Sequence, residues 1–193
     1  MIGLLVGCSE SPSSKDTAAV QVPASSKVKS DPIDLGNDAK APPASSIKTD
    51  DDLNQYNQSM LKTQQDFYEA MTLFDHFLED VESKRMSKDR LANAIESKIL
   101  PAFKKLVDPV SRAQANQGQL KVLHLMITQA LKNMNDALDR MLQDIRSNNQ
   151  IGYAASLKDS NRAYRMIFTW NELYVKFGRA GGVEPLDFTT PQE

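Results

Sequence analysis

Cysteine is almost missing from this sequence, because Cys8 is the only one among 193 residues. A single thiol excludes an internal disulfide and any zinc site built from several cysteine ligands, so we expect the folded part to be stabilised by packing. Long apolar runs are missing too, because no stretch reaches the roughly 20 residues that a membrane-spanning helix needs. Any attachment to a membrane must therefore be covalent or peripheral.

An excess of one charge is also missing. Lys and Arg number 23 and Asp and Glu number 25, which gives a formal net charge of −2 at pH 7. A chain so balanced offers no large positive field to nucleic acid, so we expect no nucleic-acid partner. The length allows one domain of ordinary size, which is roughly 100–150 residues, plus a tail.

The start of the chain carries the one motif with a family resemblance. Leu5-Val6-Gly7-Cys8 resembles the lipobox of bacterial lipoprotein precursors, and the resemblance covers these positions only. In that class a signal peptidase cuts before the cysteine, whose thiol receives a diacylglycerol. The resemblance implies a truncated signal segment at residues 1–7 and lipidation of Cys8 with acyl chains such as palmitate. Two or three such chains would anchor the protein stably.

The resemblance also implies an address, which is the bacterial cell envelope. A charged start and a longer apolar stretch ahead of the lipobox are missing, so the true start of the signal peptide stays open. Ser9 stands where an aspartate would resemble the inner-membrane retention signal of Gram-negative lipoproteins. We therefore expect the outer membrane or the periplasmic face in a Gram-negative envelope, while the envelope type and leaflet stay open.

The segment after Cys8 has the composition of a linker. Residues 8–49 are rich in Ser, Pro, Ala and Lys, and no aromatic residue occurs before Tyr56. So little apolar surface cannot offset the entropy of ordering, which predicts a disordered, lipid-anchored tether. A flexible coil of this length spans about 35–40 Å. The alternative to a plain spacer is a docking role for Ile33-Asp34-Leu35.

After residue 49 the apolar residues recur with the 3.6-residue period of helices rather than the two-residue period of strands. This predicts an all-α fold, an antiparallel up-and-down bundle of four helices over residues 50–182, followed by an irregular C-terminal tail at residues 183–193. The second helix is shorter and should bend near residues 97–101, because Pro101 lacks a backbone donor. We expect the four helices at residues 49–85, 87–107, 108–147 and 150–179.

Two apolar seams carry the bundle prediction, and both alternate steps of three and four residues. The first comprises Leu53, Tyr56, Met60, Gln64, Phe67, Met71, Phe74, Leu78 and Val81. The second comprises Val110, Ala113, Gln117, Leu120, His124, Ile127, Leu131, Met134, Leu138, Met141 and Ile145. Asp108-Pro109 is interpreted as the start of the third helix, which gives that helix a length of about 58 Å. In the tail, Leu186 and Phe188 are candidates to fold back over the bundle.

None of the usual ligand patterns of helical bundles is complete in this sequence. A di-iron site needs Glu-x-x-His, but Leu73 and Lys121 stand three residues before His76 and His124. Covalent haem needs Cys-x-x-Cys-His, which does not occur. Non-covalent haem would need His124 and a methionine such as Met60 to meet in the core, and packing explains both residues as well. We therefore expect no cofactor and no metal.

Motifs of enzymes are missing in the same way. No G-x-S-x-G, no Gly-rich phosphate loop and no evident nucleophile with a histidine base occurs. The acidic residues Asp75, Glu79 and Asp80 are explained by a solvated helix face. We therefore expect that the protein is not an enzyme.

Three polar residues interrupt the apolar seams, and these are Gln64, Gln117 and His124. Buried polar residues in coiled-coil seams often fix the register at a cost in stability, which is the preferred interpretation here. The alternative is a small internal cavity or a pH response, because histidine gains its charge at about pH 6.

Residues 161–179 combine aromatic and basic side chains. Arg162, Arg165, Trp170 and Tyr174 are candidates for a partner-binding site, because Arg, Trp and Tyr dominate the hot spots of protein interfaces. A core stripe is the preferred interpretation of the aromatic members.

Together these observations favour a membrane-anchored cell-envelope lipoprotein that acts as a non-enzymatic protein-binding or scaffold module. Its expected partners are the membrane, through the N-terminal lipid, and an envelope protein. The alternative is a helical-bundle carrier of a small ligand or cofactor, such as haem or a metal. The identity of the partner and the oligomeric state stay open.

Overall fold

The computed structural model describes residues 49–115 and 118–190, of which 83% are helical and none is in a strand. The predicted helical fold class is therefore confirmed. The lipidation candidate Cys8, the predicted tether and the seam residue Gln117 lie outside the described residues. Within the described ranges, no helix is both long and apolar enough to cross a bilayer.

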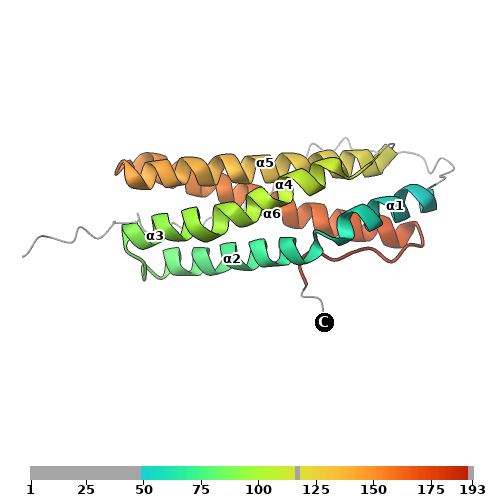
Figure 1. Cartoon of the computed structure of the whole chain (residues 1–193), viewed down its shortest axis with the longest axis horizontal. Helices are drawn as coiled ribbons and strands as arrows, with labels where there is room; N and C mark the ends of the chain where they lie inside the picture. Colours follow the sequence, from blue (N-terminus) through green and yellow to red (C-terminus); the bar gives the residue numbers. More distant parts are fainter. Residues whose placement is uncertain (1–48, 116–117, 191–193) are drawn as a thin grey trace, which may run out of the picture.

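Five continuous helical segments make up most of the described chain and run along the length of an elongated domain, the first two of them end to end (Figure 1). The third of them is interrupted by a π-helical turn, Ile95–Ile99, which joins two α-helices. Helix α5 packs along α6 and α4, and α4 also packs on α2. The α-helices are α1 (Thr49–Leu61), α2 (Gln64–Glu82), α3 (Lys88–Ala94), α4 (Leu100–Arg112), α5 (Gly118–Arg146) and α6 (Gln150–Ala180).

The helix predicted over residues 49–85 is divided in two at Lys62 and Thr63. The hydroxyl of Thr63 donates a hydrogen bond of 2.6 Å to the carbonyl of Met60, and the Thr63 N–H donates one of 2.9 Å to the same oxygen. Such local bonds from threonine compete with the regular helical ladder. Met60 and Gln64 are both buried, so the apolar seam continues across the break.

The predicted start of the third helix at Asp108-Pro109 is wrong. Helix α4 continues through Pro109 to Arg112, Ala113 is extended, and α5 begins only at Gly118, which has a φ of +57°. A positive φ favours glycine, which makes Gly118 the real boundary signal. The 29 residues of α5 give it a length of about 44 Å rather than about 58 Å.

Where a bend was predicted near Pro101, the structure has the π-helical turn. The N–H of Leu100 donates to the carbonyl of Ile95, five residues earlier instead of four. Pro101 follows directly and has no N–H to donate, so the regular ladder could not pass through this point in any case.

The ends of α6 agree with the prediction to within a residue. Asn149 caps its first turn by accepting a hydrogen bond of 3.0 Å from the N–H of Gly152. Asn148 takes a φ of +61° and Gly182 one of +72°, so the chain turns sharply at both ends of the helix.

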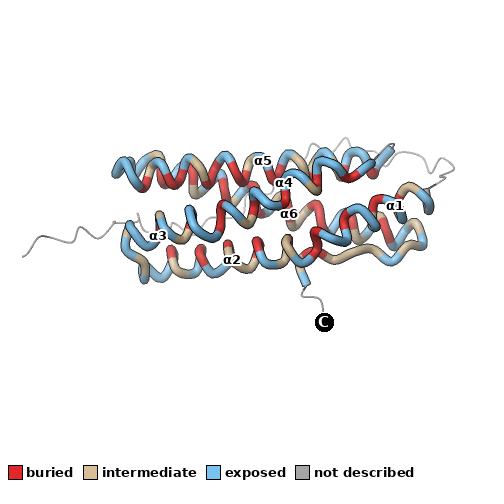
Figure 2. The backbone as a smooth tube through the Cα atoms, viewed as in Figure 1, coloured by how far each residue is buried: buried red, intermediate tan, exposed pale blue. Residues whose placement is uncertain are grey.

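Aromatic side chains fill the centre of the domain. The ring of Trp170 stacks on Tyr174 at 5.4 Å and on Phe67 at 5.8 Å, measured between ring centroids. Phe188, which is 1% exposed, closes the cluster at 5.0 Å from Trp170 and 5.2 Å from Phe67. The predicted return of Phe188 to the bundle is thus confirmed. Buried residues lie on the inward sides of all the helices (Figure 2).

Replacing Trp170 by alanine should destabilise the domain strongly. The side chain is fully buried, and its removal should lower the free energy of unfolding by about 3–5 kcal/mol. Urea denaturation followed by circular dichroism measures this change. Leu173→Ala is the matched control, because Leu173 lies on the same helix but is 39% exposed, and it should change stability by at most about 1 kcal/mol. Equal effects of the two substitutions would contradict the central role of the aromatic cluster.

Candidate functional site

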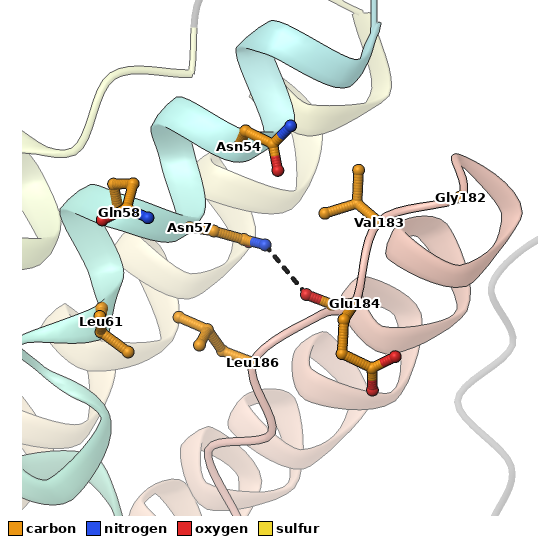
Figure 3. Close-up of a pocket in the computed structure, with 8 residues that line it drawn as sticks. All are labelled: Asn54, Asn57, Gln58, Leu61, Gly182, Val183, Glu184 and Leu186. Carbon is orange, nitrogen blue, oxygen red and sulfur yellow. Dashed lines mark hydrogen bonds between the residues drawn. The ribbon is translucent and has the colours of Figure 1, made fainter.

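An open groove of about 460 Å³ lies between α1 and the start of the C-terminal segment, by which we mean residues 183–190. Amide side chains of α1 form one wall, and apolar side chains of the C-terminal segment lie opposite (Figure 3). Glu184 is the one charged residue among the described residues that line it. The residues that define its two walls are Asn54, Asn57, Gln58, Leu61, Val183 and Leu186.

Side-chain amides from three helices hold the backbone of the C-terminal segment. Asn57 of α1 donates to the carbonyl of Glu184 at 3.2 Å, as drawn in Figure 3. Gln64 of α2 donates to the carbonyl of Asp187 at 2.6 Å. Asn171 of α6 accepts from the N–H of Phe188 at 3.1 Å. All three bonds reach main-chain atoms of the segment rather than its side chains.

The aromatic cluster forms the binding site for Phe188, which is the one fully buried side chain of the segment. We call this binding site, together with the three amides that hold the backbone, the seat. The hydroxyl of Tyr174 in this cluster donates to Asn57, so the ring cluster and the amide wall are directly connected. Pro185 packs so tightly on α6 that a Cβ at Gly178 would lie 2.6 Å from the proline ring. Glycine is therefore required at position 178 while the segment is bound.

Asp187 orders the turn at the end of the segment. Its carboxylate accepts from the N–H of Thr189 at 2.9 Å, from the Thr189 hydroxyl at 2.8 Å and from Asn171 at 3.0 Å. Burial by itself would raise the pKa of Asp187, but these hydrogen bonds outweigh burial and hold the pKa below its usual value. The carboxylate is therefore ionised at neutral pH.

Two of the residues that contact the C-terminal segment each have a buried polar atom with no hydrogen-bond partner among the described residues. The two atoms are Oε1 of Gln64 and Nε1 of Trp170, whose residues are 5% and 0% exposed. Buried polar atoms are normally paired, because an unpaired one costs stability. Both atoms therefore lack a hydrogen bond while the C-terminal segment is bound.

His124 lies half-buried on α5, facing α1. Its Nδ1 is 3.4 Å from the hydroxyl of Tyr56, and the two rings meet edge to face at 5.8 Å. Burial lowers the pKa of His124 and raises the pKa of Tyr56. Both groups are therefore neutral at pH 7, and the Tyr56 hydroxyl can donate to an unprotonated Nδ1.

The structure separates the four residues predicted to bind a partner. Arg162 and Arg165 are exposed on α6, and neither forms an ion pair with a described residue. Trp170 and Tyr174 are fully buried. The surface interpretation therefore does not apply to these two aromatic residues, because the core already covers both of their faces.

The predicted polar seam residues also have different surroundings. Gln64 is buried and binds the C-terminal segment, whereas His124 is only half-buried and contacts Tyr56. Sequence reasoning missed Asn57 and Asn171. Together with Gln64 they form the set of three amides that holds the C-terminal segment, which we call the amide clamp. Their one sequence signal is an amide directly after an aromatic residue, Asn57 after Tyr56 and Asn171 after Trp170.

The arrangement offers hydrogen bonds and apolar contact rather than reactive groups. Across the described residues, no group of three or more His, Cys, Asp or Glu side chains is placed to hold a metal ion. His76 is exposed and pairs with Glu79 at 3.6 Å on the outer side of α2. Comparison of the chain with protein-family models, curated proteins and solved structures found no match.

Acidification should weaken the domain through His124. Because the pKa is lowered on folding, the unfolded chain binds a proton below its pKa of about 6.5 before the folded chain does. The free energy of unfolding should therefore fall between about pH 7 and pH 5, and His124→Leu should reduce that fall. Denaturant titrations at each pH measure the effect. His76→Leu, at a ring that is 70% exposed, is the control, and identical pH curves for wild type and His124→Leu would contradict the prediction.

Proposed function

We propose that this protein is a lipid-anchored lipoprotein of the bacterial cell envelope whose helical domain binds another protein and performs no catalysis. The observation that carries the binding role is the amide clamp, because Asn57, Gln64 and Asn171 already hold a peptide backbone on this domain. Main-chain hydrogen bonds combined with a pocket for one side chain are a general mode of peptide recognition.

The open groove supports the same role. It continues the clamp along α1, and its walls combine amides with the partly exposed Leu61, which is 47% exposed. Mixed polar and apolar surfaces of this kind suit a protein partner. The exposed Arg162 and Arg165 would add charge-assisted contacts on α6.

The proposed domain architecture is an antiparallel up-and-down bundle in which α1 and α2 together count as one interrupted helix. Support comes from short connections, since residues 147–149 alone join α5 to α6 and residues 83–87 alone join α2 to α3. Short connections place consecutive helices beside each other in opposite directions.

The proposed address depends on the lipobox resemblance at Cys8. Acylation there would place the domain at the end of the tether predicted for residues 8–49, and the described helices begin at Thr49. The outer membrane is the proposed site in a Gram-negative envelope, with the domain in reach of envelope proteins.

A carrier of a small ligand is the second candidate function. The groove volume of about 460 Å³ falls within the range of ligand pockets, which is roughly 300–1,000 Å³. Haem or a metal would need a ligand such as the imidazole of His124, which is half-buried. Visible absorbance or stoichiometric metal in protein purified from its native host would favour this candidate over protein binding.

The lipid anchor is tested by replacing the cysteine. Cys8→Ser should move the protein from the membrane fraction to the soluble fraction and abolish labelling by radioactive palmitate, because the thiol carries the diacylglycerol. Ser9→Ala is the matched control and should stay membrane-bound and labelled. Mass spectrometry of the mature wild-type protein with an unmodified thiol and an intact initiator methionine would refute the lipoprotein assignment.

The binding role is tested by a charge placed in the groove. Leu61→Glu should weaken in-cell crosslinking to an envelope protein at least about tenfold, because a carboxylate replaces apolar contact area. Ile151→Glu is the control, since Ile151 is 87% exposed and lies at the other end of α6 from the groove. Crosslinking that both substitutions leave unchanged would rule out the groove as the partner site.

A further inference from the structure

We propose that the C-terminal segment is an exchangeable ligand of the domain. In this view residues 183–190 occupy the amide clamp and the aromatic cluster of their own chain, and a segment of a partner protein with an aromatic residue takes their place. The inference rests on the proposed protein-binding function and deepens it, because it names the site and the chemistry of the partner.

The seat recognises features that any extended peptide can supply. Three of its hydrogen bonds reach main-chain groups, which are the carbonyls of Glu184 and Asp187 and the N–H of Phe188, and Asn171 also donates to the carboxylate of Asp187. The one deep side-chain position takes an aromatic ring, which packs on Phe67, Trp170 and Tyr174. A partner segment therefore needs an aromatic residue at this position, and a carboxylate directly before it would reproduce the bond from Asn171.

The seat is also incompletely matched to its present occupant. Oε1 of Gln64 can accept another hydrogen bond and Nε1 of Trp170 can donate one, and neither has a partner among the described residues. Both atoms are buried, so an occupant that paired them would gain over the C-terminal segment. This mismatch favours a segment from another protein over a second copy of this chain as the intended occupant.

The connection to α6 allows the segment to leave without unfolding the helix. Gly181 and Gly182 follow the end of α6, and a side chain at Gly182 would meet no atom within 4 Å. The φ of +72° at Gly182 is a conformation that glycine leaves at little cost. Phe188 is the one fully buried side chain of the described segment that must be withdrawn from the core, together with the partly buried Val183 and Leu186 that pack against it.

The release of the C-terminal segment from its own chain determines how tightly a partner can bind. A segment tethered by a short linker competes at an effective concentration in the millimolar range. The apparent affinity for a partner is reduced by the fraction of chains whose seat is open. The C-terminal segment thus acts as an autoinhibitory ligand that excludes weak or non-aromatic competitors.

Hydrogen exchange on the intact full-length chain tests whether the segment opens by itself. The N–H of Phe188 donates to Asn171 of α6, and the N–H of Thr189 donates to the carboxylate of Asp187, which Asn171 also holds. We expect them to exchange at least about 100-fold faster than the amides of Ile127 and Leu131 in the middle of α5. Equal exchange rates, with equal dependence on denaturant, would mean that the segment leaves only on global unfolding and would overturn the proposal.

Gly178→Ala is a variant that weakens the segment and spares the core. The added Cβ would meet the Pro185 ring at 2.6 Å, whereas alanine is the better residue inside a helix. Exchange at Phe188 and Thr189 should accelerate at least about tenfold, and exchange at Ile127 should not. Equal acceleration at all three amides would overturn the proposal, because it would make the segment part of the cooperative core.

Peptide binding tests the exchange itself, with the single tryptophan of the chain as the probe. A peptide of residues 183–190 is titrated into full-length protein while the indole signal of Trp170 is followed by nuclear magnetic resonance. Full-length Phe188→Ala, whose own anchor is removed, should bind this peptide at least about tenfold more tightly than wild type does. A peptide carrying Phe188→Ala is the control and should bind neither chain.

The outcomes separate this inference from the proposed function. Equal affinity of both chains for the peptide would overturn the inference, and so would the absence of binding to a folded Phe188→Ala chain. If that variant does not fold, the hydrogen-exchange experiment on wild type tests the inference instead. A dimer that forms with rising concentration and is lost in Phe188→Ala would assign the seat to a second copy and overturn the partner assignment. In each case envelope crosslinking sensitive to Leu61→Glu would leave the protein-binding function standing.

Discussion

The stacking of Trp170 between Phe67 and Tyr174 is the interaction on which the rest of the domain depends. It joins α2 to α6, and Phe188 completes it from the C-terminal segment. Large aromatic rings contribute much apolar area and prefer offset or edge contacts, so one such cluster can fix the mutual position of several helices. The groove and the amide clamp exist because the cluster brings α1, α2 and α6 close enough to hold one peptide backbone.

Helix content and most buried positions could be predicted because helices bury residues at a fixed period. The described members of the two seams are buried apart from Leu78 and His124, which are half-buried. Boundaries were harder, since the period continues through interruptions: Met60 and Gln64 are buried on both sides of Thr63. Gly118 signals the late start of α5. The apolar residues Val110 and Ala113 concealed this signal, because they continue the helical period ahead of it.

The site was less predictable than the fold, because its chemistry involves a segment without any period. Gln64 was recognised as an unusual seam residue, but its partner is a main-chain carbonyl 123 positions away in the sequence. Composition cannot indicate such a contact. Trp170 was open to two interpretations for a related reason, since one tryptophan suits a core and an interface equally well. Only the packing of Phe67, Tyr174 and Phe188 around Trp170 shows that its ring is covered.

The π-helical turn keeps the buried residues of the third helical segment on one face. Its buried residues Leu91, Ile95, Ile99 and Phe103 follow one another at steps of four, and four residues of α-helix turn through about 400°, which would rotate the stripe by about 40° at each step. A wider turn absorbs this drift. The extra residue that the turn accommodates therefore keeps α3 and α4 presenting one continuous face to α5, and a shortened version of this segment would direct its two halves toward different neighbours.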